Sequence, residues 1–390
     1  MPAERRLPES LKLSRAGVVY ALVALVGVLA LASAAQGRAP YLDPMNVSNI
    51  LDQTALLGIL AVSTTIVLIS GNFDLSIGSV AALGAALCLS LIGPIGFWPA
   101  FLVALATGAL VGLFNGVVVQ YVGINAFIVT LGTMTGVRGL VLIVTDGRTV
   151  TPPAGDGASA LRGIDAGRWI TPNLYLVAGI TVLLLAGWRL WSQRAAGPRD
   201  AALRSPAVLV PGVLGLVLVA ASPALIFTVQ VTQRTTYLLV LVAVAAWVLR
   251  FTTVGRRLYA TGGNPEAARL SGVAVNRYKV LAFVLNGTAA AFVGVLYAAR
   301  IGSINPTGLT GYELTALAAA ILGGTALFGG VGSVLKSLAG ALILVTLKNG
   351  FNILNLGANW QGLIEGMVLI VAAAMYTVSA RRPAVRTAGE

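Results

Sequence analysis

Residues 262–272 read GGNPEAARLSG, a strongly polar passage in a chain of 390 residues that is 57% hydrophobic and only 10% charged. Basic sequence flanks it on both sides, with GRR at 255–257 and NRYK at 276–279, and each flank borders a long apolar run. The chain has more apolar sequence than a soluble domain can bury. The passage is therefore predicted to be a loop held at one face of a membrane.

Within this passage the residue types predict a short helix. Asn264 is a favourable N-cap, Pro265 suits the first helical position, and Gly272 suits the left-handed residue that follows a helix end. A helix of about two turns is marginal in water by itself, because isolated helices below about 12 residues are unstable. It needs a surface to lie on, and Ala267 and Ala268 would let that surface approach closely.

Long apolar stretches recur along nearly the whole chain, and each can cross the hydrocarbon core of about 30 Å. They predict an all-α polytopic membrane protein with about twelve transmembrane helices in a region at 16–379. We place the spans at 16–36, 50–70, 75–93, 97–121, 124–145, 173–193, 206–228, 236–252, 278–299, 313–329, 333–351 and 359–379. The stretch at 313–329 is, with 236–252, one of the two shortest of them, and the sequence leaves open whether it crosses the whole membrane.

The basic residues are distributed unevenly between the two sets of loops. With a cytoplasmic N-terminus, the inner loops receive about twice as many Lys and Arg residues as the outer loops, as the positive-inside rule requires. This asymmetry predicts cytoplasmic tails at 1–15 and 380–390, an outer loop at 145–172 and an inner loop at 192–206. It also accounts for the net charge of +13 without a nucleic-acid partner, which would need that charge gathered on one soluble face.

Several classes of chemistry are excluded by what the sequence lacks. It has no histidine and a single cysteine, Cys88, which lies in an apolar run and is typical of a small buried hydrophobic residue. An intramembrane hydrolase therefore has no convincing nucleophile and base, and we expect no catalytic site and no metal site. The chain also lacks a G-x-x-x-x-G-K-S/T loop, so we expect no bound cofactor, and ATP with Mg²⁺ would belong to a separate ATPase.

Four stretches of the sequence resemble the permease subunits of bacterial ABC sugar importers, in the ribose/xylose branch of that family. They are NVSNILDQTALLGILAVSTTIVLISGNFDLSIGS at 46–79, AFIVTLGTMTGVRG at 126–139, GRRLYATGGNPEAARLSGVAVNRYK at 255–279 and GYELTALAAAILGGTALFGGVGS at 311–333. Together they cover most of the chain in the order expected of the family. Members of the ribose type lack about two spans at 173–228, whereas xylose-type permeases carry an extra segment there, so the xylose type is the better match.

The resemblance implies a ten-helix permease core with two extra spans, in the bacterial inner membrane. It also implies that the chain works as a homodimer with two separate ABC ATPase subunits and an extracytoplasmic sugar-binding protein, and imports a neutral monosaccharide such as xylose. In this family a coupling loop, here 253–277, docks a short helix into a groove on the ATPase. The residues implied for that contact are Asn264, Pro265, Glu266, Ala267, Ala268, Arg269 and Gly272.

The sequence departs from the family pattern at two places. Glu313-Leu314-Thr315 stands where Glu-Leu-Asp is common, which excludes a carboxylate role at Thr315. Gly71-Asn72-Phe73-Asp74 stands where Gly-x-Ile-Asp is usual, a change that keeps Asp74. The first departure leaves the identity of the sugar more open.

Four polar residues are candidates for the translocation path, and each has a structural alternative. Asp74 lies between two apolar runs and is expected to be an N-cap of the next helix, at a break that borders the path. Asn286 lies in mid-span, where an amide more often joins helices than binds a ligand. Asn305 and Glu313 would lie at the outer mouth, although an acid such as Glu313 also suits the first turn of a helix.

A secondary transporter acting alone is the alternative from another class. It would need carboxylates in the membrane that titrate or bind Na⁺, and Asp52 and Glu365 lie nominally within spans. The low charge of the spans, with only scattered amides and hydroxyls such as Thr288, favours a neutral, polyhydroxylated cargo in either case.

Overall fold

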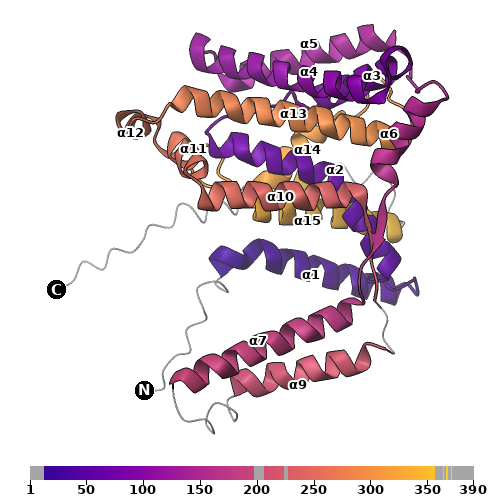
Figure 1. Ribbon diagram of the computed structural model, residues 1–390, viewed down its shortest axis with the longest axis vertical. Helices are drawn as coiled ribbons and strands as arrows, with labels where there is room; N and C mark the ends of the chain where they lie inside the picture. Colours follow the sequence, from indigo (N-terminus) through magenta and orange to yellow (C-terminus); the bar gives the residue numbers. More distant parts are fainter. Residues whose placement is uncertain are drawn as a thin grey trace. The chain divides into compact units, whose positions relative to one another are not determined.

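The computed structural model describes residues 13–196, 206–223 and 227–355, together with isolated helical positions between 363 and 370. The elements in chain order are α1 Leu13–Ala35, α2 Pro44–Ile69, α3 Ile77–Ile95, α4 Phe97–Val117, the π-helix η2 Val118–Val122, α5 Ala126–Thr145, α6 Asp156–Ala166, β1 Arg168–Ile170, α7 Leu174–Ala196, α9 Pro206–Ala221, β2 Gln230–Thr232, α10 Gln233–Phe251, α11 Thr253–Gly263, α12 Pro265–Leu270, α13 Val275–Ile301, α14 Tyr312–Leu322 and α15 Val334–Ile353 (Figure 1).

Eight of these helices are long and apolar enough to cross a membrane, and they confirm the polytopic character of the chain. They are α1, α2, α3, α4 with η2, α5, α10, α13 and α15. Three more predicted spans coincide with shorter apolar helices, at Leu174–Trp188, Val210–Ala221 and Tyr312–Leu322. Most of the twelfth predicted span at 359–379, most of the inner loop at 192–206 and the tail at 380–390 lie outside the described residues.

The prediction of a span at 313–329 is wrong. α14 is an 11-residue helix that ends at Leu322. Gly324, Gly329 and Gly330 follow it with φ of 80°, 91° and 75°, a region that residues with a side chain rarely adopt. The apolar stretch therefore continues as a turn-rich segment rather than as a helix, and within it Ala326 is buried whereas Phe328 is 87% exposed.

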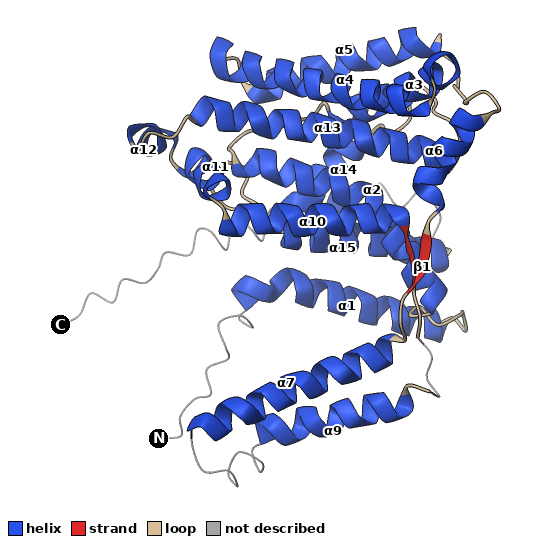
Figure 2. Cartoon of the chain, viewed as in Figure 1, coloured by secondary structure: helices blue, strands red, loops and turns tan. Residues whose placement is uncertain are grey.

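Helix predominates in the described chain, but the all-α prediction missed two short strands (Figure 2). β1 and β2 pair antiparallel with Trp169 opposite Val231. They belong to the second of two compact units, which contains residues 42–49 and 168–232 and in which α7 and α9 pack through Gly179 and Gly215. Each strand has only three residues and lies beside a long apolar run, so the sequence pattern did not reveal it.

The first unit contains residues 1–41, 50–167 and 233–390, and α2 lies at its centre. In its most apolar window, 78% of α2 is buried inside the protein, compared with 22% for α5 and 11% for α1. Figure 1 shows α13 between the group α3–α5 and the group that contains α10, α14 and α15. α13 packs against α3 and α4, whereas α15 packs against α14, α1 and α10.

Close packing in this unit depends on glycines that bring two main chains into contact. A Cβ atom on Gly108 of α4 would lie 2.3 Å from the carbonyl oxygen of Gly287 on α13, and one on Gly287 would lie 2.2 Å from that of Gly108. A Cβ atom on Gly294 of α13 would lie 1.8 Å from the carbonyl oxygen of Ala81 on α3. Small residues commonly allow such approach between membrane helices, where the hydrophobic effect does not drive association.

The ends of α13 separate two groups of connections. α13 has 27 residues and is therefore about 40 Å long, enough to cross a bilayer. α12 immediately precedes its first residue, Val275, whereas Leu161 and Arg162 of α6 line a cavity together with Arg300 and Gly302 at its far end. α6 and α12 must consequently lie on opposite sides of the membrane that α13 crosses.

This arrangement predicts opposite accessibility for two exposed serines. In a Cys88→Ser background, we expect Ser159→Cys on α6 to react with a membrane-impermeant maleimide in intact cells, because the outer loop is predicted to contain it. Ser271→Cys after α12 should react only after permeabilisation. Labelling of Ser271→Cys from outside in intact cells would show that the charge asymmetry has been assigned to the wrong side.

Candidate functional site

The short helix predicted in the polar passage is present as α12. Asn264 is its N-cap, with its side-chain oxygen accepting a hydrogen bond from Ala267 N at 3.0 Å, and Pro265 occupies the first turn. Gly272 has a φ of 79°, as expected for the left-handed residue after a helix end. The helix is only six residues long, so its position depends on the segments at either side.

The segment before it, α11, was not predicted and connects α12 to the membrane helices. Thr252 caps α11 by accepting a hydrogen bond from Gly255 N at 3.3 Å. Tyr259 donates its hydroxyl proton to the carbonyl oxygen of Gly332 at 2.8 Å. Burial raises the pKa of Tyr259, so the hydroxyl keeps the proton that this hydrogen bond needs.

One side of α12 faces away from the protein, and we call its residues Glu266, Ala267, Arg269 and Leu270 the docking surface. Leu270 is 91% exposed, the largest exposed fraction among the large apolar side chains that the structure describes. The sequence indicated the helix but did not single out this leucine. Ala268 is only 5% exposed, so the surface that approaches it closely is the protein itself, and its side chain is not open to the ATPase contact that the resemblance implied.

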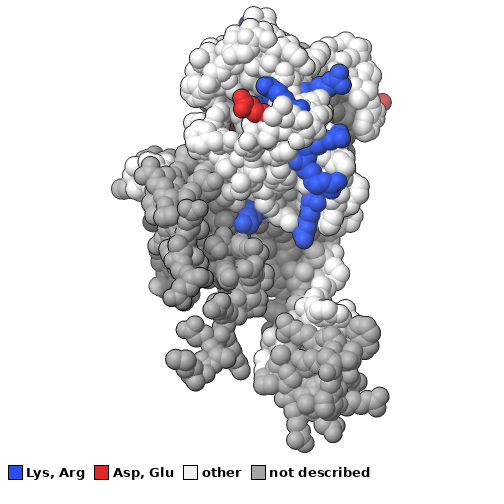
Figure 3. All heavy atoms as spheres, turned by 90° about the vertical axis from the view of Figure 1, so that its left-hand side faces the viewer, with Lys and Arg blue, Asp and Glu red and all other residues white. Residues whose placement is uncertain are grey.

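Positive charge gathers at the same end of the first unit. Figure 3 shows Lys and Arg side chains across the face that carries α11 and α12, with little acidic surface among them. Arg256, Arg257, Arg269 and Arg277 are all exposed there, and Glu266 is the acid within the docking surface. An arginine-rich end of this kind is typical of a cytoplasmic loop.

Behind α11, three segments distant in sequence meet through their main chains at what we call the glycine junction, formed by Gly71, Gly262, Gly329 and Gly330. A Cβ atom on Gly262 would lie 1.8 Å from the carbonyl oxygen of Ile69, and one on Gly329 would lie 2.7 Å from Gly71 Cα. Gly330 N donates to the carbonyl oxygen of Ile69 at 3.0 Å. The end of α11 is thus held directly against the end of α2 and the loop after α14.

Asp74 lies in the irregular segment between α2 and α3, which we call the α2–α3 break, but it is not the N-cap that the sequence suggested. Ser76 occupies the N-cap position of α3, and Asp74 accepts hydrogen bonds from Ser76 N at 3.0 Å and Ser76 Oγ at 2.6 Å. The carboxylate is 4% exposed, since the turn through Leu75 directs it into the protein rather than along the helix axis.

Asp74 belongs to a buried polar chain of side chains that extends across several elements. Asn286 of α13 donates to Asp74 Oδ2 at 3.0 Å, and Asn115 of α4 donates to Ser76 Oγ at 3.0 Å. Thr133 of α5 donates to Asn115 Oδ1 at 2.6 Å. The prediction that Asn286 joins helices agrees with this contact, whereas Ser76, Asn115 and Thr133 were missed, although an amide within an apolar run was a signal at Asn115.

Thr133 also lies in the wall of an open groove of about 710 Å³ between α4 and α5. A second cavity of about 280 Å³ adjoins the α2–α3 break and shares Ile124 with the groove. Its polar side chains are Asn72, Gln120, Asn125 and Lys279. The buried polar chain therefore ends at the wall of the groove, and the adjoining cavity is lined by amide and ammonium groups.

Asn305 and Glu313, predicted to lie together at an outer mouth, have different surroundings. Asn305 is exposed, but Glu313 is 8% exposed, and its Oε1 accepts from Gly311 N at 3.1 Å. A Cβ atom on Gly78 would lie 2.1 Å from Glu313 Oε2, so only glycine fits opposite this carboxylate. Arg138 of α5, which was not predicted, donates to the carbonyl oxygens of Pro306 and Gly308 at 3.0 and 2.9 Å and holds the loop between α13 and α14.

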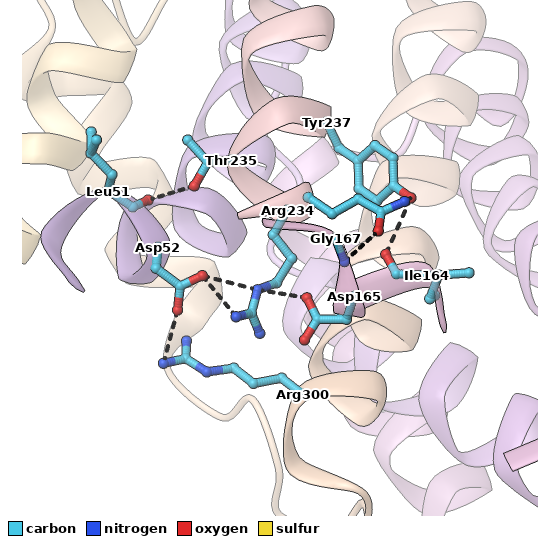
Figure 4. A network of polar contacts seen from close by, with 10 residues as sticks. Leu51, Asp52, Ile164, Asp165, Gly167, Arg234, Thr235, Tyr237 and Arg300 are labelled. Carbon is cyan, nitrogen blue, oxygen red and sulfur yellow. Dashed lines mark hydrogen bonds and ion pairs between the residues drawn. The ribbon is translucent and has the colours of Figure 1, made fainter. Parts of the chain in front are cut away.

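A cluster of alternating charges lies near the N-terminal half of α2 (Figure 4). Arg234 Nη2 donates to Asp52 Oδ1 at 2.7 Å, and Arg300 Nη2 lies 3.3 Å from Asp52 Oδ2. Arg234 Nε lies 2.9 Å from Asp165 Oδ1, a charge contact rather than a hydrogen bond because its proton points to Asp52. Asp52 is thus neutralised by two arginines, while Glu365 lies outside the described residues.

Comparison with known proteins assigns the family. Residues 46–373 match the family described as branched-chain amino acid transport system / permease component. The chain belongs to this permease family. The match includes the α2–α3 break, the docking surface and the glycine junction within its bounds. No solved structure matches the permease.

The curated relatives of the permease carry sugar names. It is 36% identical to the xylose transport system permease protein XylH of Escherichia coli over 88% of this chain and 87% of that one. It is 34% identical to the ribose import permease protein RbsC of Haemophilus influenzae over 84% and 83%, and 32% identical to the Escherichia coli RbsC over 90% and 91%. The ribose/xylose branch is therefore confirmed, and the permease is a multi-pass protein of the bacterial inner membrane.

The charge cluster generates a prediction about the stability of the permease. Arg234 is 3% exposed and serves both carboxylates, whereas Arg300 is 34% exposed and serves one. Removing one partner of a buried ion pair costs about 3–5 kcal/mol, so Arg234→Gln should lower the free energy of unfolding in detergent by an amount of that order. Arg300→Gln, the matched control, should cost less, and equal losses in the two variants would contradict the central role of Arg234.

Proposed function

We propose that the chain is the membrane-spanning subunit of an ATP-driven ABC importer for a neutral monosaccharide, with xylose or a related pentose as the cargo. The observation that carries the proposal is the docking surface: a capped helix at the arginine-rich end of the molecule that exposes a leucine together with Glu266 and Arg269. The names of the curated relatives supply the sugar class.

The docking surface suits a protein partner better than solvent or lipid. Its apolar part, Leu270, would lose its exposure in a groove, while Glu266 and Arg269 at the rim would fix orientation through opposite charges. We infer that the partner is the ATPase, which would hold ATP and Mg²⁺ and supply the hydrolysis. This chain would bind the ATPase and move the sugar, and would break no covalent bond itself.

The remaining partners are inferred from exposed surfaces and from the relatives. α5 exposes a row of apolar side chains, including Phe127, Ile128 and Ile143 at 52%, 63% and 77%, next to the groove. A second copy of the chain packed there would cover that face and close the groove into a path, so we propose a homodimer. A soluble sugar-binding protein would deliver the cargo at the end that carries α6.

A secondary transporter remains the second candidate, and the charge cluster weighs against it. A carboxylate that carries H⁺ or Na⁺ must release its other partners during the cycle. Asp52 instead lies between Arg234 and Arg300 and holds α2 against α10 and α13. The proposed ATP dependence and this alternative differ in whether the chain transports without an ATPase.

Substitutions in the docking surface should abolish transport without affecting membrane insertion. The double variant Glu266→Arg with Arg269→Glu should insert and fold normally but lose sugar uptake, because both charges at the rim would oppose those of the ATPase. Leu270→Ala should weaken ATPase binding about tenfold or more in detergent, the effect expected for an interface anchor. Leu314→Ala, at an exposed leucine on α14, is the control, and full uptake by the double variant would refute the assignment.

The cargo class is tested with the reconstituted complex of permease, ATPase and binding protein encoded beside it. We expect pentose-loaded binding protein to stimulate ATP hydrolysis, because the cavity at the α2–α3 break presents amides suited to sugar hydroxyls. An amino acid such as leucine is the informative competitor, given the name of the family. Stimulation by an amino acid alone would show that the cargo class is wrong.

A further inference from the structure

We propose that the glycine junction and the buried polar chain together transmit movement of the docking surface to the groove between α4 and α5. This inference rests on the proposed function, since it supposes that an ATPase moves α12. It adds a role for four residues outside the docking surface. Tyr259 and Gly262 belong to α11, and Ser76 and Asn115 belong to the buried polar chain.

The first step leads from the docking surface to the junction. A single residue, Asn264, separates α12 from α11, and Ala268 packs α12 against the protein. At the end of α11, Gly262 touches the carbonyl oxygen of Ile69 with no side chain between them, and Tyr259 is hydrogen-bonded to Gly332. Because two main chains in contact cannot yield as a flexible side chain can, a displacement of α11 must displace the end of α2.

The second step leads along the α2–α3 break. Gly71 follows α2 with a φ of 84°, and only a few residues separate it from Ser76. Asn72 accepts a hydrogen bond from Gln120 on η2 at 3.3 Å, and Asp74 is bonded to Ser76 and Asn286. A displacement of the α2 end therefore acts on side chains that already connect the break to α13 and to the segment after α4.

The third step leads to the groove. Ser76 Oγ donates to Asp74 and accepts from Asn115, whose side-chain oxygen accepts from Thr133 in the groove wall. Asn286 Oδ1 is buried and has no hydrogen-bond partner within the described chain. A buried acceptor without a donor costs about 1–3 kcal/mol. If the side chains moved to a second arrangement in which Asn286 Oδ1 accepts a hydrogen bond, that new bond would offset part of the energy lost by breaking the present contacts. The buried polar chain can thus stabilise two different arrangements, which a connection that switches between two states requires.

A competing route would run from α12 straight into α13, which begins a few residues later. In that case α13 would transmit the movement, and the α2–α3 break would move as a result without transmitting it. The two routes differ at Ser76, because its hydroxyl is the only atom joining the Asp74 and Asn115 contacts described above.

The test uses the complete reconstituted complex in proteoliposomes and measures sugar taken up per ATP hydrolysed. Ser76→Ala removes one oxygen from the middle of the buried polar chain, and Tyr259→Phe removes the hydroxyl that bonds α11 to Gly332, beside the glycine junction. Ser79→Ala is the matched control, because the Ser79 hydroxyl is also buried in α3 and bonds only to the main chain at Ser76. Thermal unfolding of each variant separates an effect on coupling from an effect on stability.

We expect Ser76→Ala and Tyr259→Phe each to lower uptake per ATP about three- to tenfold, the range for loss of one hydrogen bond. Both should unfold at the temperature of the Ser79→Ala control. The double variant should be no worse than the poorer single variant, since both lie on one route. Wild-type uptake per ATP in Ser76→Ala, or multiplied losses in the double variant, would overturn this inference. Wild-type uptake without the ATPase would instead overturn the proposed function.

Discussion

The helices of the first unit depend on contact between main chains at glycines. Gly108 with Gly287 and Gly294 with Ala81 leave no space for even one methyl group, and Gly262 meets Ile69 in the same way at the end of α2. Within a bilayer, dispersion and main-chain proximity replace the hydrophobic effect as the source of helix association. The position of the α2–α3 break, and hence of Asp74, follows from where these contacts place α2, α3 and α13.

The two ends of α13 are held by different kinds of interaction. At the end near α6, Arg234 and Arg300 join α2, α10 and α13 through Asp52, and such contacts are specific in direction and charge. At the end near α12, the glycine junction makes contact without side chains. A segment that has to pass on an external force is better served by the second kind, because a main chain in direct contact displaces its neighbour, whereas movement at the other end would have to break a desolvated ion pair.

Much of this arrangement could be predicted from the sequence. Hydropathy located the long helices, and the residue types at Asn264, Pro265 and Gly272 gave the caps of α12 correctly. It could not give the end of α14 at Leu322, because the apolar residues after it are as hydrophobic as those within it, nor the short strands. The partners of Asp74 were also beyond reach, since Asn115 and Thr133 come from other helices and only the packing brings them together.

The absence of side chains at the glycine junction has a consequence for how such a permease can change over generations. The groove between α4 and α5 is lined by side chains of many sizes, so its shape can change through small substitutions, and with it any preference for the solute of the proposed function. Gly262 has no smaller or intermediate replacement, since any other residue adds at least a Cβ atom 1.8 Å from Ile69 O. If the chain acts as proposed, its choice of solute can change gradually, whereas a substitution at Gly262 would disrupt the proposed connection in a single step.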